Sequence, residues 1–301
     1  MKRIVLTLVG GAALILGCNN KENASKVPKV NIYEEGEFRY IETNGVPNHK
    51  TGEFPTQFCP FGIGEKEFTY KVPLTPTESE EKITAGQYMF GVAVNGVVFD
   101  PAGPFWNKDM STGWEFHPAS QHIRDYFGVD LNNAHTQPLG PNSDLGLYHY
   151  HGLPTKLIDS LSAVKESQML LLGYAADGYP IYNQFAPSDP MDLSSTMKEM
   201  KPGYKLKTGS RQSGEPEGDY NGAFVQDYNF IDGHGDLDEY NGRYGITEEY
   251  PEGTYYYCIT QDFPNMPLYF RGEPNASFQH EGPGNEMAEV PPQIRDWPAQ
   301  P

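Results

Sequence analysis

Short segments of alternating apolar and polar residues, separated by Gly and Pro, run through most of the chain. Residues 88–100 and 170–182 each place an Asn-Gly or Asp-Gly pair between two apolar segments, a pattern typical of a β-hairpin with a type I′ turn. Further strands are predicted at 67–72, 148–151 and 254–260. Strand signals therefore dominate the pattern.

Helical patterns are fewer and shorter. We predict helices over 118–127 and 155–167, and a third over 191–200, whereas 201–222 is rich in Gly, Lys and Glu and is predicted to be an exposed loop. The expected fold is mainly β (β-rich α+β), with antiparallel sheets, hairpins and a few short peripheral helices.

The first 18 residues have the pattern of an export signal. Lys2 and Arg3 precede an apolar run from Ile4 to Leu16, which is too short for a permanent membrane span. The sequence Leu16-Gly17-Cys18 resembles the lipobox of bacterial lipoproteins, in which the Cys is acylated, for example with palmitate. The alternative is an ordinary signal peptide of a secreted protein with an incidental Cys.

This resemblance predicts a membrane anchor and a division of the chain. Residues 1–17 are the signal peptide, 18–31 a tether, 32–280 a single domain and 281–301 a flexible tail. Asn19 replaces the Asp that retains lipoproteins in the inner membrane, so we expect an outer-membrane lipoprotein of the bacterial cell envelope, facing the periplasm or the surface.

Composition narrows the class of protein. Gly and Pro together make up 58 of 301 residues, or 19%, against about 12% on average, which argues against a helix bundle. The 40 acidic and 22 basic residues give a net charge of −18. Such a chain repels a phosphate backbone, so nucleic-acid binding is not expected.

Two cysteines remain after the lipidation of Cys18. Because the envelope is oxidising, Cys59 and Cys258 are predicted to form a disulfide. The alternatives are a metal thiolate or two buried thiols.

Two histidines carry the first sign of a metal site. His149 and His151 lie two residues apart in Tyr148-His149-Tyr150-His151, so a strand places both imidazoles on one face and both phenols on the other. Such a pair can bind one transition-metal ion. The alternative is hydrogen-bonded packing in a polar pocket.

The segment 232–239 offers further ligands at every second position. An EF-hand is excluded because Arg243 occupies the position of the bidentate Glu and Leu237 that of the turn Gly. His234 is expected as a third imidazole, although a turn-rich surface loop explains the segment equally well.

Four blocks in order resemble the YHYH domain family of bacterial exported proteins. They are Asn95-Gly96-Val97 with Phe99, and the segments at 146–154, 172–182 and 237–257. The resemblance covers roughly 88–272 and implies that polar residues concentrate at His149, His151, Asp177, Asp238 and Asn241. It implies no established reaction.

These observations predict a divalent transition-metal site, with Zn, Cu, Mn or Fe as the ion. The expected ligands are His149, His151, His234 and Asp238, the possible additional ligands are His135, His117 and Asp236, and other polar residues of the site are Asp177, Glu239 and Asn241. Glu239 is a candidate general base at an open coordination position. Asp177 is also explained as a turn residue, and Asp238 as a capping or Arg243-pairing residue.

Two other functions stay open. One is a metal-dependent hydrolase or oxygenase. The other is a non-metal module that binds a glycan, a small molecule or a protein through exposed aromatic side chains, for which the candidates are Tyr148, Tyr150, Tyr255, Tyr256, Tyr257, Trp106 and Trp114. The sequence has no Gly-x-Ser-x-Gly elbow, Walker loop, dinucleotide fingerprint or His-Glu-x-x-His motif.

Overall fold

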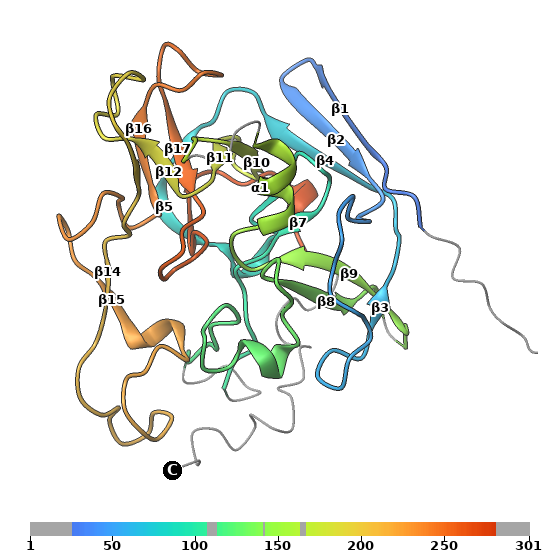
Figure 1. The fold of residues 1–301 in the computed structure, drawn as a ribbon, viewed down its shortest axis with the longest axis vertical. Coiled ribbons are helices and arrows are strands. Elements are labelled where there is room, and N and C mark those ends of the chain that lie inside the picture. The colour runs from blue at the N-terminus through green and yellow to red at the C-terminus, as the bar shows by residue number, and fades with distance from the viewer. Residues whose placement is uncertain (1–25, 107–112, 141, 163–166, 281–301) are drawn as a thin grey trace, which may run out of the picture.

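A mixed β-sheet forms the centre of the protein (Figure 1). The computed structural model describes residues 26–106, 113–140, 142–162 and 167–280. The strands of the central sheet are β3 (Gly62–Ile63), β6 (Gly91–Ala93), β7 (Val98–Phe99), β8 (Ala134–Pro138), β9 (Leu145–Tyr150), β10 (Leu171–Ala175), β11 (Pro180–Tyr182), β16 (Gly242–Gly245) and β17 (Thr254–Cys258). Their order is β16-β17-β11-β10-β6-β7-β9-β3, and β8 also pairs with β9.

Smaller sheets surround this centre. One contains β1 (Val30–Glu35), β2 (Phe38–Thr43) and β4 (Phe68–Pro73), and three pairs are formed by β5 (Glu78–Thr84) with β18 (Tyr269–Gly272), β12 (Phe185–Pro187) with β13 (Met197–Glu199), and β14 (Tyr204–Leu206) with β15 (Tyr228–Phe230). In Figure 1 the β1–β2 hairpin and the two-stranded β14–β15 sheet lie on opposite sides of the molecule. The predicted mainly β class with hairpins is confirmed, while β7–β9, β3–β9 and β11–β17 are parallel pairs.

Helices are short, as expected. The described residues contain one α-helix, α1 (Thr155–Leu161), and four 3₁₀ helices, which are η1 (Ala85–Gln87), η2 (Arg124–Phe127), η3 (Val225–Asp227) and η4 (Ala276–Phe278). Within the predicted helix at 118–127 only η2 is helical, because the Ser120 hydroxyl accepts the His122 N–H and favours a turn.

The predicted helix at 191–200 is wrong. The side chains of Asp189 and Asp192 accept backbone N–H groups two residues further on, from Met191 and Ser194. These local bonds give the backbone an alternative to the helix, and Met197–Glu199 then forms β13.

The two hairpin turns differ from the predicted type I′. Only Gly96 and Gly178 have positive φ, at +82° and +100°. Asn95 and Asp177 keep negative φ, and their side-chain oxygens accept the N–H two residues on, at 3.2 and 3.4 Å. Each loop is therefore a type I turn followed by a left-handed Gly, the arrangement of a three-residue hairpin loop with a G1 bulge.

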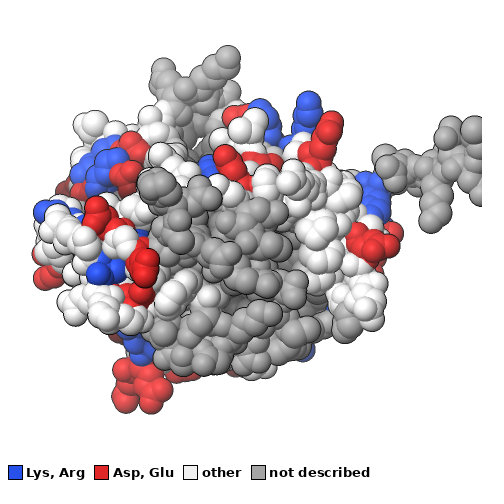
Figure 2. Space-filling view, turned by 90° about the horizontal axis from the view of Figure 1, so that it is seen from below, with Lys and Arg blue, Asp and Glu red and all other residues white. Residues whose placement is uncertain are grey.

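Aromatic side chains fill most of the core. Tyr148, Tyr150, Tyr257 and Phe90 are fully buried against the central sheet. No helix among the described residues is long and apolar enough to cross a membrane. On the face shown in Figure 2, acidic and basic side chains are interspersed along the edges.

Segment 201–222 is not wholly an exposed loop. Tyr204–Leu206 forms β14, and the guanidinium of Arg211 forms a fully buried ion pair with Asp227, with Nη2 and Oδ2 2.6 Å apart. Arg211 also donates to Asn221, at 2.8 Å. This pair ties the loop to η3.

Candidate metal centre

The pairing of β8 with β9 brings three histidines together. His135 is the register partner of His149 on the antiparallel neighbour strand, and His151 follows two residues later, so all three rings lie on one face of the sheet. The Nε2 atoms of His149 and His151 are 2.9 Å apart, and those of His151 and His135 are 3.0 Å apart. This cluster is the one group of three or more metal-ligating side chains found among the described residues.

Backbone carbonyls fix the orientation of two of the rings. Nδ1 of His135 lies 2.6 Å from the carbonyl oxygen of Phe127, and Nδ1 of His149 lies 3.1 Å from that of Leu147. A carbonyl only accepts, so each Nδ1 is the donor and each neutral ring presents the lone pair of Nε2 to the cluster. Metal-bound histidines have such second hydrogen bonds, which set the tautomer and the ring orientation.

Burial keeps these imidazoles neutral. The pKa of His135 is lowered, and the pKa values of His149 and His151 are lowered well below the ordinary value, first because burial penalises the charged form. The neighbouring rings repel a second positive charge and lower the pKa of His151 further. Neutral imidazole is the form that binds metal, so protons compete weakly for these nitrogens.

A single proton cannot give all three converging nitrogens a hydrogen-bond partner. A hydrogen on Nε2 of His151 makes one good hydrogen bond, to His135 or to His149, and leaves the other nitrogen with an unpaired lone pair at about the same distance. A metal ion accepts all three lone pairs at once. The three imidazoles are therefore arranged so that they could hold one metal ion.

Further polar side chains lie beside the cluster. Asp100 directly follows β7, and its N–H donates to the carbonyl of Tyr150 at 2.9 Å, which places Asp100 next to His151. Its carboxylate is buried and lies 3.8 Å from Nε2 of His280. His117 is also buried, and neither ring nitrogen has a hydrogen bond of ordinary geometry; burial lowers its pKa to about 4.

The opposite face of β9 carries the phenols, as the alternation predicts. The Tyr148 hydroxyl donates to Asp130 at 2.8 Å. The Tyr150 hydroxyl accepts from the Asn95 amide at 3.0 Å and lies 2.5 Å from Nε2 of His49. Both phenols are fully buried, so they anchor the strand that carries the imidazoles.

The acidic segment 232–239 does not join the cluster. His234, expected as the third imidazole, is exposed, and His135 takes that place instead. Asp236 binds the Lys198 ammonium at 2.6 Å and the backbone N–H of Lys201 at 3.0 Å. The register between β8 and β9 determines which candidate histidine joins the cluster. A single sequence does not give that register.

Asp238 and Glu239 have structural partners of their own. The Asp238 carboxylate accepts from the backbone N–H of Gly242 at 3.1 Å and from the Tyr255 hydroxyl at 2.9 Å. Glu239 binds the Lys82 ammonium at 2.6 Å. Asp238, expected as a metal ligand, and Glu239, expected as a general base, therefore lie outside the three-histidine cluster. Asp238 caps a backbone turn and Glu239 forms an ion pair with Lys82.

Asp177 and Asn241 also stabilise the fold. The buried Asp177 carboxylate accepts from the Tyr257 hydroxyl at 2.5 Å and from the Gly272 N–H at 3.0 Å. Asn241 takes a positive φ of +56°, and its amide donates to the carbonyl of Cys258 at 2.8 Å. Neither side chain belongs to the three-histidine cluster.

The predicted disulfide is absent. Cys59 and Cys258 are both free and buried. The Cys59 thiol contacts the Thr136 hydroxyl at 3.0 Å, whereas Cys258 lies in β17, where burial raises its pKa to about 12. The alternative of two buried thiols is the one observed. Cys18 lies outside the described residues.

The comparisons with known proteins give the family. A family model with the description YHYH protein matches residues 69–272, which is more than half of the chain, so the chain belongs to the YHYH family. The match includes β7, β8 and β9 and all three histidines of the cluster. No curated protein and no solved structure matches the chain.

Sequence reasoning missed several residues around the site. His49, Asp100, Asp130 and His280 gave no local motif, and their positions follow from the pairing of distant segments. Asp130 lies four residues before β8. A prediction of β8 as a strand would therefore have drawn attention to Asp130 and His135 together.

Proposed function

We propose that the protein binds one transition-metal ion through the Nε2 atoms of His135, His149 and His151. The convergence of three neutral imidazole nitrogens, two from the buried His149 and His151 and one from the partly buried His135, is the observation that carries this proposal. The hydrogen bonds from Nδ1 of His135 and His149 to backbone carbonyls support it, because they hold the lone pairs in place before the ion arrives.

The ligand set favours zinc or copper. Imidazole nitrogen suits Zn, Cu, Ni and Fe, while Mn²⁺ and Ca²⁺ prefer oxygen. The cluster contains neither a carboxylate nor a thiolate. Three imidazoles leave a fourth position of a tetrahedral zinc site for water.

That open position makes a metal-dependent hydrolase the second candidate. Three protein ligands and a water are the arrangement of catalytic zinc sites, where the metal lowers the pKa of the water. The backbone of Asp100 lies next to His151, and its buried carboxylate is the candidate acceptor for a hydrogen bond from such a water. An oxygenase is less well supported, because non-haem iron oxygenases use two histidines and one carboxylate.

A glycan- or protein-binding module receives little support. Tyr148, Tyr150, Tyr256 and Tyr257 are fully buried and Trp114 is nearly so. Stacking on a sugar requires exposed aromatic faces, and these side chains pack the core instead.

We further propose that the metal site lies in the bacterial cell envelope. The basic and apolar start of the chain, followed by Leu16-Gly17-Cys18, supports a signal peptide and a lipid anchor on Cys18. Mass spectrometry of the membrane fraction tests this: the anchor predicts a chain that begins at an acylated Cys18, and an unmodified residue there contradicts it.

Metal content tests the site. The full chain is purified without a histidine-containing tag and analysed for bound metals beside His149→Ala/His151→Ala and beside His234→Ala, whose histidine is exposed. We expect about one equivalent of zinc or copper in the wild type and in His234→Ala, and none in the double variant. No metal in the wild type after loading with Zn, Cu, Mn and Fe contradicts the proposal.

A further inference from the structure

A cavity of about 140 Å³ lies between η1, the segment after β7 and the start of η3. Its wall combines apolar side chains, such as Ala102, Val225 and Leu268, with polar groups of Thr84 and Tyr269. Pockets for drug-sized ligands occupy about 300–1,000 Å³, so this cavity suits a smaller molecule.

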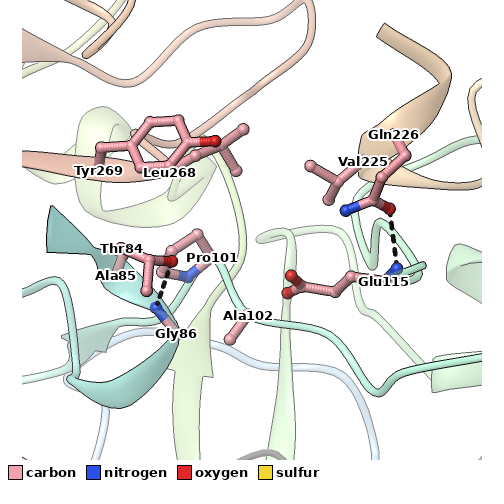
Figure 3. Close-up of a pocket in the computed structure, with 10 residues that line it drawn as sticks. All are labelled: Thr84, Ala85, Gly86, Pro101, Ala102, Glu115, Val225, Gln226, Leu268 and Tyr269. Atoms are coloured by element: carbon pink, nitrogen blue, oxygen red, sulfur yellow. Dashed lines mark hydrogen bonds between the residues drawn. The ribbon is translucent and has the colours of Figure 1, made fainter. Parts of the chain in front are cut away.

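One carboxylate enters this cavity. Figure 3 shows the Glu115 side chain pointing from one wall toward Ala102 and the opposite side of the cavity. One of its oxygens, Oε1, accepts the N–H of Gly103 at 2.9 Å. Among the described residues, none of the ion pairs involves Glu115.

An acidic neighbour, Asp100, lies close to this carboxylate. Asp100 lies close enough to raise the pKa of Glu115, in addition to the larger effect of burial, which together bring it to about 7. Asp100 has its own partners in the Ala102 N–H, at 3.0 Å, and His280. A carboxylate held in low-dielectric surroundings is stabilised strongly by a cation that approaches it directly.

We propose that the cavity is a binding site for a small molecule that carries a cationic amine. The ammonium group pairs with the free oxygen of Glu115, and a short aliphatic part packs against Ala102, Val225 and Leu268. Thr84 and Tyr269 offer hydrogen-bonding hydroxyls at the other end. This inference does not depend on the metal, although the peptide that forms the wall at Ala102 continues directly from Asp100, beside His151.

A charge series tests the ligand class. Butylammonium, 1-butanol and butyrate share the same chain and differ in the charge of the head group, and ligand-observed NMR follows their binding to the full chain. We expect saturable binding of butylammonium alone, with a Kd on the order of 1 mM for so few atoms. Equal binding of butanol, or no saturable binding of butylammonium about tenfold above that concentration, overturns the proposal.

Variants locate the site. Glu115→Gln is expected to weaken butylammonium binding about 10- to 100-fold, because it removes a charge-assisted hydrogen bond, while Glu80→Gln, at an exposed position on β5, leaves it unchanged. Ala102→Leu keeps the carboxylate but fills the cavity, so it is expected to abolish butylammonium binding. This variant tests the site independently if Glu115→Gln fails to fold. Unchanged affinity in Glu115→Gln or in Ala102→Leu overturns the assignment.

One further variant separates this site from the metal centre. His149→Ala/His151→Ala, once shown to be folded by circular dichroism, is expected to bind butylammonium as the wild type does. Loss of metal with retained amine binding therefore tests the two proposals independently. Loss of amine binding in this folded variant contradicts an independent site.

Discussion

Nε2 of His151 lies 3.0 Å from Nε2 of His135, a residue 16 positions away in the sequence. The contact arises because β8 pairs with β9 in a register that places His135 opposite His149. A slip of one residue turns the His135 ring to the other face of the sheet. The phenols on the opposite face form hydrogen bonds with Asp130 and His49. These bonds fix the position of β9 and so stabilise this register.

Removal of His135 is predicted to weaken metal binding strongly. His135→Ala takes away one of three ligands, so the Kd for Zn²⁺ is expected to rise by more than the roughly 10- to 100-fold caused by loss of a supporting residue. Isothermal titration with a competing chelator measures it. His122→Ala, which changes an exposed histidine, serves as the control, and equal affinities in the two variants would falsify the role of His135.

The Asp177–Tyr257 hydrogen bond is predicted to stabilise the fold. Asp177 is fully buried and ties the β10–β11 turn to β17 and β18. Tyr257→Phe removes a donor from a buried carboxylate, so the free energy of unfolding is expected to fall by about 1–3 kcal/mol in urea denaturation. Tyr244→Phe, at a largely exposed position, is expected to change it little. The metal content stays the same in both variants.

The buried Arg211–Asp227 ion pair is predicted to contribute more to the free energy of unfolding than an exposed ion pair does. Asp227→Asn leaves the Arg211 charge without its partner in a site that is 0% exposed, which is expected to cost about 3–5 kcal/mol of stability. The matched change Asp262→Asn breaks the exposed pair with Lys201, which is worth about 0–1 kcal/mol. Similar losses in the two variants would show that Arg211 is not buried as described.

Stability is predicted to depend on pH through Glu115. Burial raises its pKa from 4.5 to about 7, so between these values the folded protein binds more protons than the unfolded chain does. The free energy of unfolding then falls as the pH rises from about 4.5 to about 7. The wild type is expected to lose about 2–3 kcal/mol over this range relative to Glu115→Gln. Parallel pH profiles of the two proteins, measured by urea denaturation, would contradict this.

Thiol chemistry distinguishes two buried cysteines from a disulfide. In the full chain with Cys18→Ser, we expect two reactive thiols after unfolding without a reductant, because Cys59 and Cys258 are free. In the folded protein both react slowly, since burial shields them and raises the pKa of Cys258 to about 12. Thiols that appear only after reduction would indicate a disulfide instead.

Local patterns predicted the mainly β class and the strands at 67–72, 148–151 and 254–260, but not β1, β2, β5 or β8. The alternation in the Tyr-His-Tyr-His run placed the imidazoles and the phenols on opposite faces, and the Gly residues at 96 and 178 marked both hairpins. The turn type was wrong because Asn95 and Asp177 bond to the backbone two residues on and keep negative φ. Side-chain bonds from Asp189 and Asp192 likewise prevented the helix predicted at 191–200.

The third histidine of the cluster could not be chosen from the sequence alone. His135, His117 and His234 were all candidates by residue type, and the acidic residues around His234 made that segment attractive. Those carboxylates bind lysines and backbone N–H groups instead. The pairing of β8 with β9 selects His135, and such long-range pairing depends on the whole sheet.

X-ray absorption spectroscopy of the zinc-loaded full chain tests the central claim most directly, because it reports the atoms bound to the ion. The three-histidine site predicts three imidazole nitrogens at about 2.0–2.1 Å, with one further light atom from water. In His135→Ala we expect the imidazole scattering to fall by about one third or the zinc to be lost. A spectrum with sulfur at about 2.3 Å, or one without imidazole scattering, would contradict the account.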